Sequence, residues 1–189
     1  MAKKAIVLLA DGFEEVEAIT PVDYLRRAGI EVTTVSISDS LTVTGRWTGV
    51  RLLADITLPE LIKTGQAEKC YDAVILPGGM PGAANLSASA ETGALIKNMA
   101  AEEKLVCAIC ASPAIILAPL GLIAGKKFTC YPKMEEKVSD GTWSAESVVT
   151  DGNIITGRAA GTAGFFSIAI IEKLLDKETA KKITETVLL

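Results

Sequence analysis

Apolar positions recur along the chain with two spacings, one typical of buried strands and one typical of helices. Residues 5–10, 71–79 and 105–109 are apolar almost without interruption, as expected for strands buried on both faces of a parallel sheet. Residues 31–37 are rich in β-branched side chains, and 126–131 is a fourth strand candidate of the same kind. The helical spacing predicts helices over 14–29, 58–65, 91–103, 112–121, 160–175 and 177–189.

Turn residues divide these elements. Gly29 follows the first predicted helix as a C-terminal capping glycine would, and Pro21 is expected to disturb the helix locally. Residues 41–56 predict a hairpin that turns near 45–49, and 147–157 predict a second hairpin around Asp151-Gly152. The alternation of strands and helices predicts one α/β domain over residues 1–189, with a mostly parallel sheet covered by helices on both faces.

Ligands of such sheets bind beyond the carboxyl ends of the strands. This rule selects three segments for candidate chemistry: ADGFEEVE (10–17), LPGGMPG (76–82) and CAICASP (107–113). The glycine-rich segment has neither a P-loop nor a dinucleotide-binding pattern. It is either a tight turn or, beside a nucleophile, a set of backbone N–H groups for an oxyanion.

Composition narrows the function classes. The formal charge of −4 and the lack of a basic stretch argue against a binding site for nucleic acid or for an anionic membrane. The apolar run near the N-terminus is too short for a signal peptide and no run could span a bilayer, so a cytoplasmic location is expected. The four cysteines are then expected to be reduced thiols.

The chain contains no histidine. This excludes Ser-His-Asp and Cys-His nucleophile pairs and the common zinc sites that need an imidazole. Acid–base chemistry must therefore come from carboxylates, thiols, lysine or tyrosine.

Cys110 lies where the third apolar strand gives way to a predicted helix. A helix N-terminus favours thiolate, and strand-to-helix turns are places where nucleophiles are presented, yet most free cysteines are small buried hydrophobic residues, so both interpretations stay open. Cys107 completes a C-x-x-C pattern, but an extended chain would hold the two Cα atoms about 10 Å apart, too far for a disulfide. Cys107 is therefore expected in the core.

Glu14, Glu15 and Glu17 cluster at the start of the first predicted helix. Acidic residues in a first turn ordinarily complement the helix dipole. One of them could instead lie beside Cys110, in which case the pair would share a proton and the glutamate pKa would rise.

Five segments together resemble the ThiJ/PfpI superfamily, in particular the branch of the parkinsonism-associated protein deglycase and its bacterial relatives. They are ADGFEEVEAITPVDYLRRAGIEVT, YDAVILPGGMPGAANLSAS, VCAICASPAIIL, KKFTCYPKMEEK and DGNIITGRAAGTAGFFSIAIIEKLL. The resemblance implies a flavodoxin-like three-layer sandwich, usually a homodimer, that needs no cofactor or metal. It also implies site residues: Cys110 and Glu17 as the catalytic pair, Gly78, Gly79 and Ala111 as backbone donors, and Glu14, Ser112, Tyr131, Arg158 and Ala159 around the pocket.

This chain departs from the family pattern at three places. Ser112 replaces a glycine that often follows in the cysteine elbow, and Tyr131 stands where many members carry a histidine. The segment Arg158-Ala159-Ala160-Gly161 replaces arginine-glycine-proline-glycine. Amidase or peptidase activity that depends on a Cys-His pair is disfavoured, because the chain has no histidine.

The resemblance implies an enzyme that acts on small reactive α-oxoaldehydes, converting methylglyoxal or glyoxal to 2-hydroxy acids, or that removes their early adducts from proteins or nucleotides. The alternative is a sensor of oxidative stress or a redox chaperone that works through oxidation of Cys110. A third hypothesis, a retained fold without an active site, is disfavoured by the intact pair of Cys110 and Glu17.

Overall fold

The computed structural model describes residues 2–65 and 67–189. Its fold is α/β, as predicted. Within these residues the main sheet has seven strands in the order β10-β11-β7-β6-β1-β2-β5. Their bounds are β1 (Lys4–Leu9), β2 (Glu31–Ser36), β5 (Ile56–Thr57), β6 (Ala73–Leu76), β7 (Leu105–Ile109), β10 (Val148–Asp151) and β11 (Ile154–Gly157). All neighbours pair in parallel except β10 and β11, which form the predicted antiparallel hairpin. The prediction of a mostly parallel sheet is confirmed.

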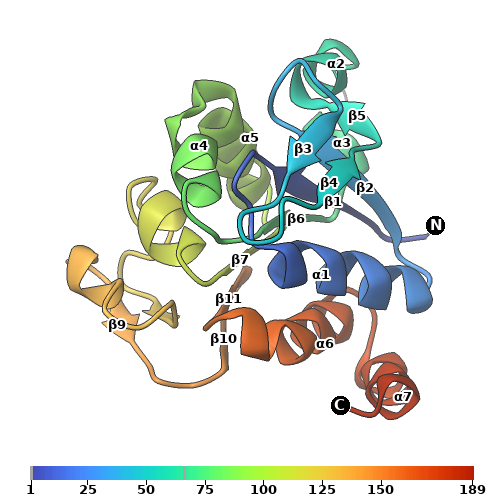
Figure 1. Cartoon of the computed structure of the whole chain (residues 1–189). Coiled ribbons are helices and arrows are strands. Elements are labelled where there is room, and N and C mark those ends of the chain that lie inside the picture. The colour runs from blue at the N-terminus through green and yellow to red at the C-terminus, as the bar shows by residue number, and fades with distance from the viewer. Residues whose placement is uncertain (1, 66) are drawn as a thin grey trace.

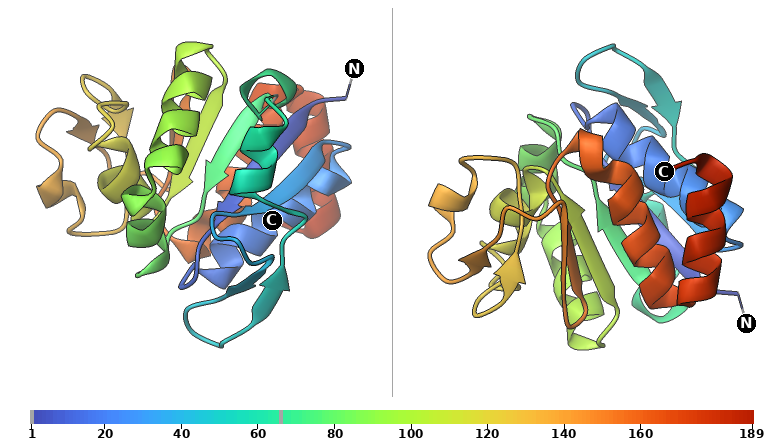
Figure 2. Two further views of the ribbon diagram at one scale, coloured as in Figure 1. Left: turned by 90° about the horizontal axis from the view of Figure 1, so that it is seen from above. Right: turned by 90° about the horizontal axis from the view of Figure 1, so that it is seen from below.

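Helices cover both faces of the sheet, as Figure 1 shows for α4 and α5 on one side and α1 and α6 on the other. The bounds of the helices are α1 (Glu15–Arg27), α2 (Leu58–Lys63), α3 (Ala67–Cys70), α4 (Gly82–Ala88), α5 (Ala90–Ala101), α6 (Ala163–Leu174) and α7 (Lys177–Val187). Short 3₁₀ turns lie at Glu135–Lys137 and Ala160–Thr162. The two views of Figure 2 show the layers from above and below, with α6 and α7 next to each other.

The alternation of side chains along each strand divides the core in two. Ile6 and Leu8 of β1 face the layer of α5, whereas Val7 and Leu9 face the layer of α1 and α6. Every residue of β6 and β7 is buried. Strands of this kind must be apolar on both faces, which is why their sequences lack the alternation of half-buried strands.

The predicted helix over 112–121 is confirmed only in part. A five-residue π-helix, Pro113–Leu117, stands there instead, followed by turns. Pro119 has no N–H to donate to the carbonyl of Ile115 in an α-helix, and the hydroxyl of Ser87 donates to that carbonyl at 2.9 Å. By contrast, α1 runs through Pro21 as one helix.

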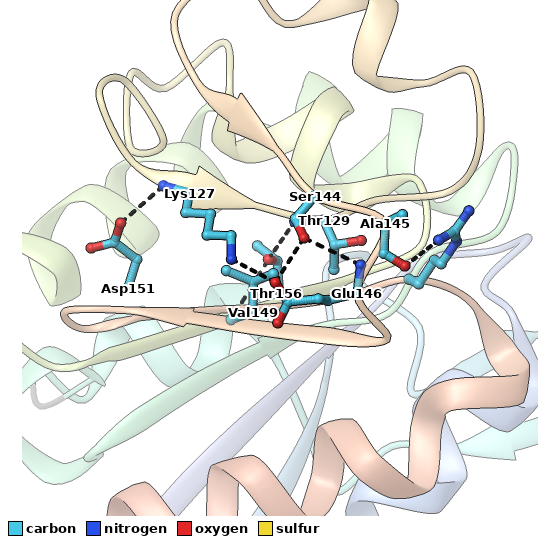
Figure 3. Close-up of polar contacts among 9 residues, drawn as sticks. Lys127, Thr129, Ser144, Ala145, Glu146, Val149, Asp151 and Thr156 are labelled. Carbon is cyan, nitrogen blue, oxygen red and sulfur yellow. Dashed lines mark hydrogen bonds and ion pairs between the residues drawn. The ribbon is translucent and has the colours of Figure 1, made fainter.

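The predicted strand over 126–131 is shorter than expected. Only β8 (Lys127–Phe128) forms, and it pairs with β9 (Thr142–Trp143) outside the main sheet. The backbone then turns toward the main sheet, because Thr129 N donates to the hydroxyl of Thr156 at 2.9 Å. Figure 3 shows the polar contacts that hold the segment 126–147 against β10 and β11.

Two further differences concern residues 41–57 and residues 82–88. The hairpin over 41–56 forms as β3 (Thr42–Thr44) and β4 (Arg51–Leu53), but Ile56 and Thr57 leave it to join the main sheet as β5. Helix α4 was not predicted, because its residues are mostly small and lack apolar periodicity. Among the described residues, no helix is long and apolar enough to cross a membrane.

Candidate active site

The three segments selected from the sequence meet at the carboxyl ends of β1, β6 and β7. Glu14 N donates to the carbonyl of Gly78 at 3.0 Å, which joins the first two segments. Gly79 has φ +87°, and a Cβ on it would lie 2.5 Å from Glu14 N. Only glycine allows this close approach of two backbones.

Cys110 has φ +64°, in the left-handed region that non-glycine residues rarely adopt. Its N–H donates to the carbonyl of Gly157 at 3.0 Å, and its own carbonyl accepts from Tyr131 N at 2.7 Å. Such a conformation costs on the order of 1–2 kcal/mol. The two hydrogen bonds fix the strained residue, so the thiol is presented at the strand end instead of entering the core.

Glu17 lies beside this thiol and is almost fully buried, with 1% of its surface exposed. Its Oε2 accepts from Gly78 N at 2.9 Å, while Oε1 has no partner in hydrogen-bonding geometry among the described residues. A Cβ on Gly78 would lie 2.6 Å from Cys110 Cβ and 2.7 Å from Glu17 Oε2. A side chain at position 78 would therefore fill the space in which Cys110 and Glu17 approach each other, and glycine leaves that space open.

The two acids N-terminal to Glu17 have other tasks. Glu14 caps α1, since its Oε2 accepts from Glu17 N at 2.7 Å. Oε1 of Glu15 accepts from Trp47 N at 3.1 Å, from Thr48 N at 3.0 Å and from the hydroxyl of Thr48 at 3.0 Å. Glu15 thus holds the tip of the β3–β4 hairpin over the start of α1.

Burial raises the pKa of Glu17 to about 7, and the negative charge of Glu14 adds to the rise. The Cys110 thiol and the N–H of Gly78 act in the opposite direction. The sequence predicts a raised pKa for a glutamate that shares a proton with the thiol, and the pKa of Glu17 shifts in that direction.

The sequence leaves open whether Cys110 favours the thiolate, and the structure opposes the thiolate as long as Glu17 carries its charge. Burial raises the pKa of Cys110, the charge of Glu17 raises it further, and the N–H groups of Gly79 and Ala111 offset only part of the rise. Protonation of Glu17 removes the repulsion. The two groups therefore titrate as one coupled pair, whose singly protonated state includes the form with a protonated Glu17 and a Cys110 thiolate.

A pocket of about 500 Å³ opens over this pair. Of the residues predicted from the sequence, it is lined by Glu14, Glu17, Gly79, Cys110, Ala111, Tyr131 and Ala159. The lining residues that the sequence did not indicate are Arg46, Trp47, Met80, Met134, Ala160 and Gly161. The first two come from the hairpin tip, and Met134 comes from the segment 126–147.

Three predicted residues do not line the pocket. Gly78 lies beneath it, with its N–H on Glu17. Ser112 is fully buried and its hydroxyl donates to the carbonyl of Pro77 at 2.6 Å, so it braces the neighbouring strand end. Arg158 turns away, because its guanidinium donates to the carbonyl of Ala145 and lies 5.8 Å from the ring centre of Trp143.

The remaining cysteines do not line the pocket either. Cys107 is fully buried in the core as predicted, and burial raises its pKa well above the ordinary value. Cys130 is buried as well, and Cys70 is exposed. Among the described residues, no group of three or more Cys, Asp or Glu side chains is arranged to hold a metal ion.

The model of the DJ-1/PfpI family matches residues 3–173. The chain belongs to the DJ-1/PfpI family. This confirms the resemblance that the sequence motifs indicated.

Individual relatives agree with this assignment. The chain is 39% identical over 183 residues to Protein DJ-1 homolog A of Arabidopsis thaliana, which covers 97% of this chain and 45% of that protein. It therefore spans less than half the length of that relative. It is 31% identical over 175 residues to the Glutathione-independent glyoxalase DJR-1.2 of Caenorhabditis elegans, covering 91% of this chain and 89% of that protein.

The fold is shared with solved structures of the family. The crystal structure of Drosophila melanogaster DJ-1beta superposes with a TM-score of 0.92 at 36% identity, over 100% of this chain and 99% of that one. The prediction of a flavodoxin-like sandwich is confirmed.

Proposed function

We propose that this protein is a cofactor-independent enzyme that converts small α-oxoaldehydes, such as methylglyoxal, to 2-hydroxy acids. The observation that carries the proposal is the pairing of Cys110 with a buried, protonatable Glu17 under a pocket. The name of the Caenorhabditis elegans relative, a glyoxalase independent of glutathione, supports it.

The reaction begins with the pair in the form of thiolate and protonated Glu17. The Cys110 sulfur attacks the aldehyde carbon, a C–S bond forms, and the carbonyl oxygen becomes an oxyanion that is protonated to give a hemithioacetal. The N–H groups of Gly79 and Ala111 are the donors for this oxyanion.

Glu17 then moves a proton from the former aldehyde carbon to the neighbouring carbon, and the hydroxyl proton passes from the first oxygen to the second, which leaves a thioester of a 2-hydroxy acid. Water hydrolyses the thioester, so the sum is methylglyoxal plus water to lactate, with no net oxidation. The unpartnered Oε1 of Glu17 is the atom that is free to carry this proton. At the carbon of a hemiaminal the sulfur would instead displace the amine: a C–S bond forms, the C–N bond breaks, and the amine leaves with a proton, which is deglycation.

The test is lactate formation from methylglyoxal by the purified chain without glutathione. Cys110→Ser should abolish turnover, and Glu17→Gln should reduce it by at least about 100-fold, the usual share of general acid–base catalysis. Cys70→Ser changes an exposed cysteine outside the pocket and is the matched control. Lactate formation by the Cys110→Ser protein would disprove the proposal.

A redox sensor is the second candidate function, favoured by the same unpartnered oxygen. A protonated Glu17 could donate to a sulfinate on Cys110 and stabilise that oxidation state. Peroxide at low equivalents should then add two oxygen atoms to the wild-type chain, as intact mass shows, and fewer to the Glu17→Gln protein. A sensor without enzymatic activity would form no lactate above the buffer blank.

We also propose that the chain forms a homodimer in the cytoplasm. Val16 and Ile19 are one helical turn apart on α1 and are 48% and 44% exposed. Exposed apolar side chains that share one helix face are typical of an interface between protein chains. Light scattering after size exclusion should give twice the chain mass, and the double variant Val16→Glu/Ile19→Glu should give a monomer.

A further inference from the structure

The walls of the pocket change in character from its floor to its mouth. The floor holds the polar and reacting groups of Cys110 and Glu17, of which Glu17 is 1% exposed. The mouth is formed by large apolar side chains that water reaches, with Met80 39%, Tyr131 50% and Trp47 69% exposed. Apolar surface gathered around a polar floor is typical of a ligand that is polar at one end and apolar at the other.

The backbone that carries Tyr131, Met134 and Trp47 is fixed by hydrogen bonds near the reacting groups. Tyr131 N donates to the carbonyl of Cys110 at 2.7 Å, and Met134 N donates to the carbonyl of Tyr131 at 3.0 Å. Trp47 N donates to Glu15, and the guanidinium of Arg46 lies 4.2 Å from the ring centre of Trp47. The mouth is therefore built before a ligand arrives, so that little ordering is needed on binding.

The size of the pocket does not match methylglyoxal. About 500 Å³ lies in the range of roughly 300–1,000 Å³ that holds drug-sized ligands. A molecule of liquid water has a share of about 30 Å³, and methylglyoxal would fill only a few such volumes. Most of the pocket beyond the reacting carbons would then hold water against apolar side chains.

The charges at the pocket indicate a neutral ligand. Glu14 lines it together with the reacting pair, so a negatively charged substituent would meet a further acidic group. Arg46 is the one basic side chain among the described lining residues, and it is stacked on Trp47. A flat, uncharged ring beside Trp47 and Tyr131 satisfies both the shape and the charge.

We propose that the preferred substrates are α-oxoaldehydes with an uncharged aromatic or similarly large apolar substituent, and that Trp47 is the side chain that selects them. This proposal rests on the proposed enzymatic function and concerns the substrate class. Phenylglyoxal, which would yield mandelate, is the simplest such substrate. It differs from methylglyoxal by a ring in place of a methyl group.

The test compares kcat/KM for phenylglyoxal and methylglyoxal in the wild type and in two tryptophan variants. We expect phenylglyoxal to be favoured by at least about tenfold, since an apolar group in a fitting pocket is commonly worth that much in discrimination. Trp47→Ala should lower the ratio of the two values by about tenfold, mainly through KM. Trp143→Ala is the matched control, because Trp143 also lies under an arginine but does not line the pocket, and its ratio should equal that of the wild type.

A ratio that stays the same in the Trp47→Ala protein would overturn the proposal. So would a preference for 4-carboxyphenylglyoxal over phenylglyoxal, because Arg46 would then select an anion. Initial rates are compared before phenylglyoxal modifies arginine side chains, which intact mass monitors.

A binding measurement separates this proposal from the enzymatic function. In a Cys110→Ser/Trp143→Phe protein, Trp47 is the only tryptophan, and its fluorescence reports on the pocket. Mandelate should quench it at a concentration at least tenfold lower than lactate does. If mandelate quenches the fluorescence but the wild type turns over no substrate, the pocket still binds aromatic ligands and the proposed enzymatic function is disproved. If the wild type turns over methylglyoxal and the two acids bind equally, only the proposed substrate class is disproved.

Discussion

The raised pKa of Glu17 predicts how the stability of the protein depends on pH. An ordinary glutamate with a pKa of 4.5 is ionised in the unfolded chain above that pH, but in the folded protein the pKa is about 7. Between these values the folded state holds a proton that the unfolded state has released, so the free energy of unfolding falls as pH rises. A difference of about 2.5 in pKa, at about 1.4 kcal/mol per unit, gives a loss of roughly 3 kcal/mol between pH 4.5 and pH 8.

Urea unfolding at pH 5, 6, 7 and 8 measures this loss, and Glu17→Gln should remove it. The comparison is the change with pH within each protein, so any constant cost or gain of the substitution cancels. Glu136→Gln, at an exposed glutamate, is the control and should follow the wild type. If the wild type and the Glu17→Gln protein lose the same free energy across this range, to within about 0.5 kcal/mol, the buried carboxyl does not bind its proton as the structure indicates.

Three further predictions concern residues around the pair. Gly78→Ala should abolish activity and destabilise the fold, because the added Cβ would lie 2.6 Å from the Cβ of Cys110. The control is Gly93→Ala, where the added Cβ meets only an ordinary contact at 3.5 Å, and it should keep the kcat and the urea midpoint of the wild type. Ser112→Ala should cost about 1–3 kcal/mol in urea unfolding by leaving the buried carbonyl of Pro77 unsatisfied, yet keep kcat, and a large fall in kcat would show that the hydroxyl acts in the reaction. Glu15→Ala should release the hairpin tip, so that limited proteolysis cuts within residues 46–50; resistance equal to that of the wild type would show that other contacts hold it.

The main sheet could be predicted from the sequence because its strands are buried on both faces. β1, β6 and β7 are continuous apolar runs, and no other element gives that signal so clearly. The missed helix α4 begins at Gly82, where a Cβ would lie 2.6 Å from Phe13 N. That helix is placed by close contact with a distant loop, which leaves no periodic pattern in its own residues.

The residues of the candidate site could likewise be predicted only in part. The rule that ligands bind beyond strand ends, together with the family resemblance, selected both members of the Cys110–Glu17 pair. The rule could not reach Trp47 and Met134, which come from the β3–β4 hairpin and the segment 126–147 outside the main sheet. The stretch GRWTG did carry a usable signal, because a tryptophan in a glycine-bounded turn has no core to enter and must lie at the surface or at a site.

The Cys110 thiol shows where reasoning from the local sequence is insufficient in this fold. A helix N-terminus after Cys110 would favour the thiolate by its dipole, but a five-residue π-helix provides little dipole, and the thiol is partly buried. Burial is the largest cause of the raised pKa of Cys110, and protonation of Glu17 removes the further rise that its charge adds. A carboxyl that keeps this proton up to about pH 7 serves such a pair near neutral pH, whereas an exposed glutamate would be ionised there and would hold the thiol protonated. In the proposed reaction, the burial of Glu17, which destabilises the folded protein above neutral pH, is therefore the same feature that lets the carboxyl keep its proton beside Cys110.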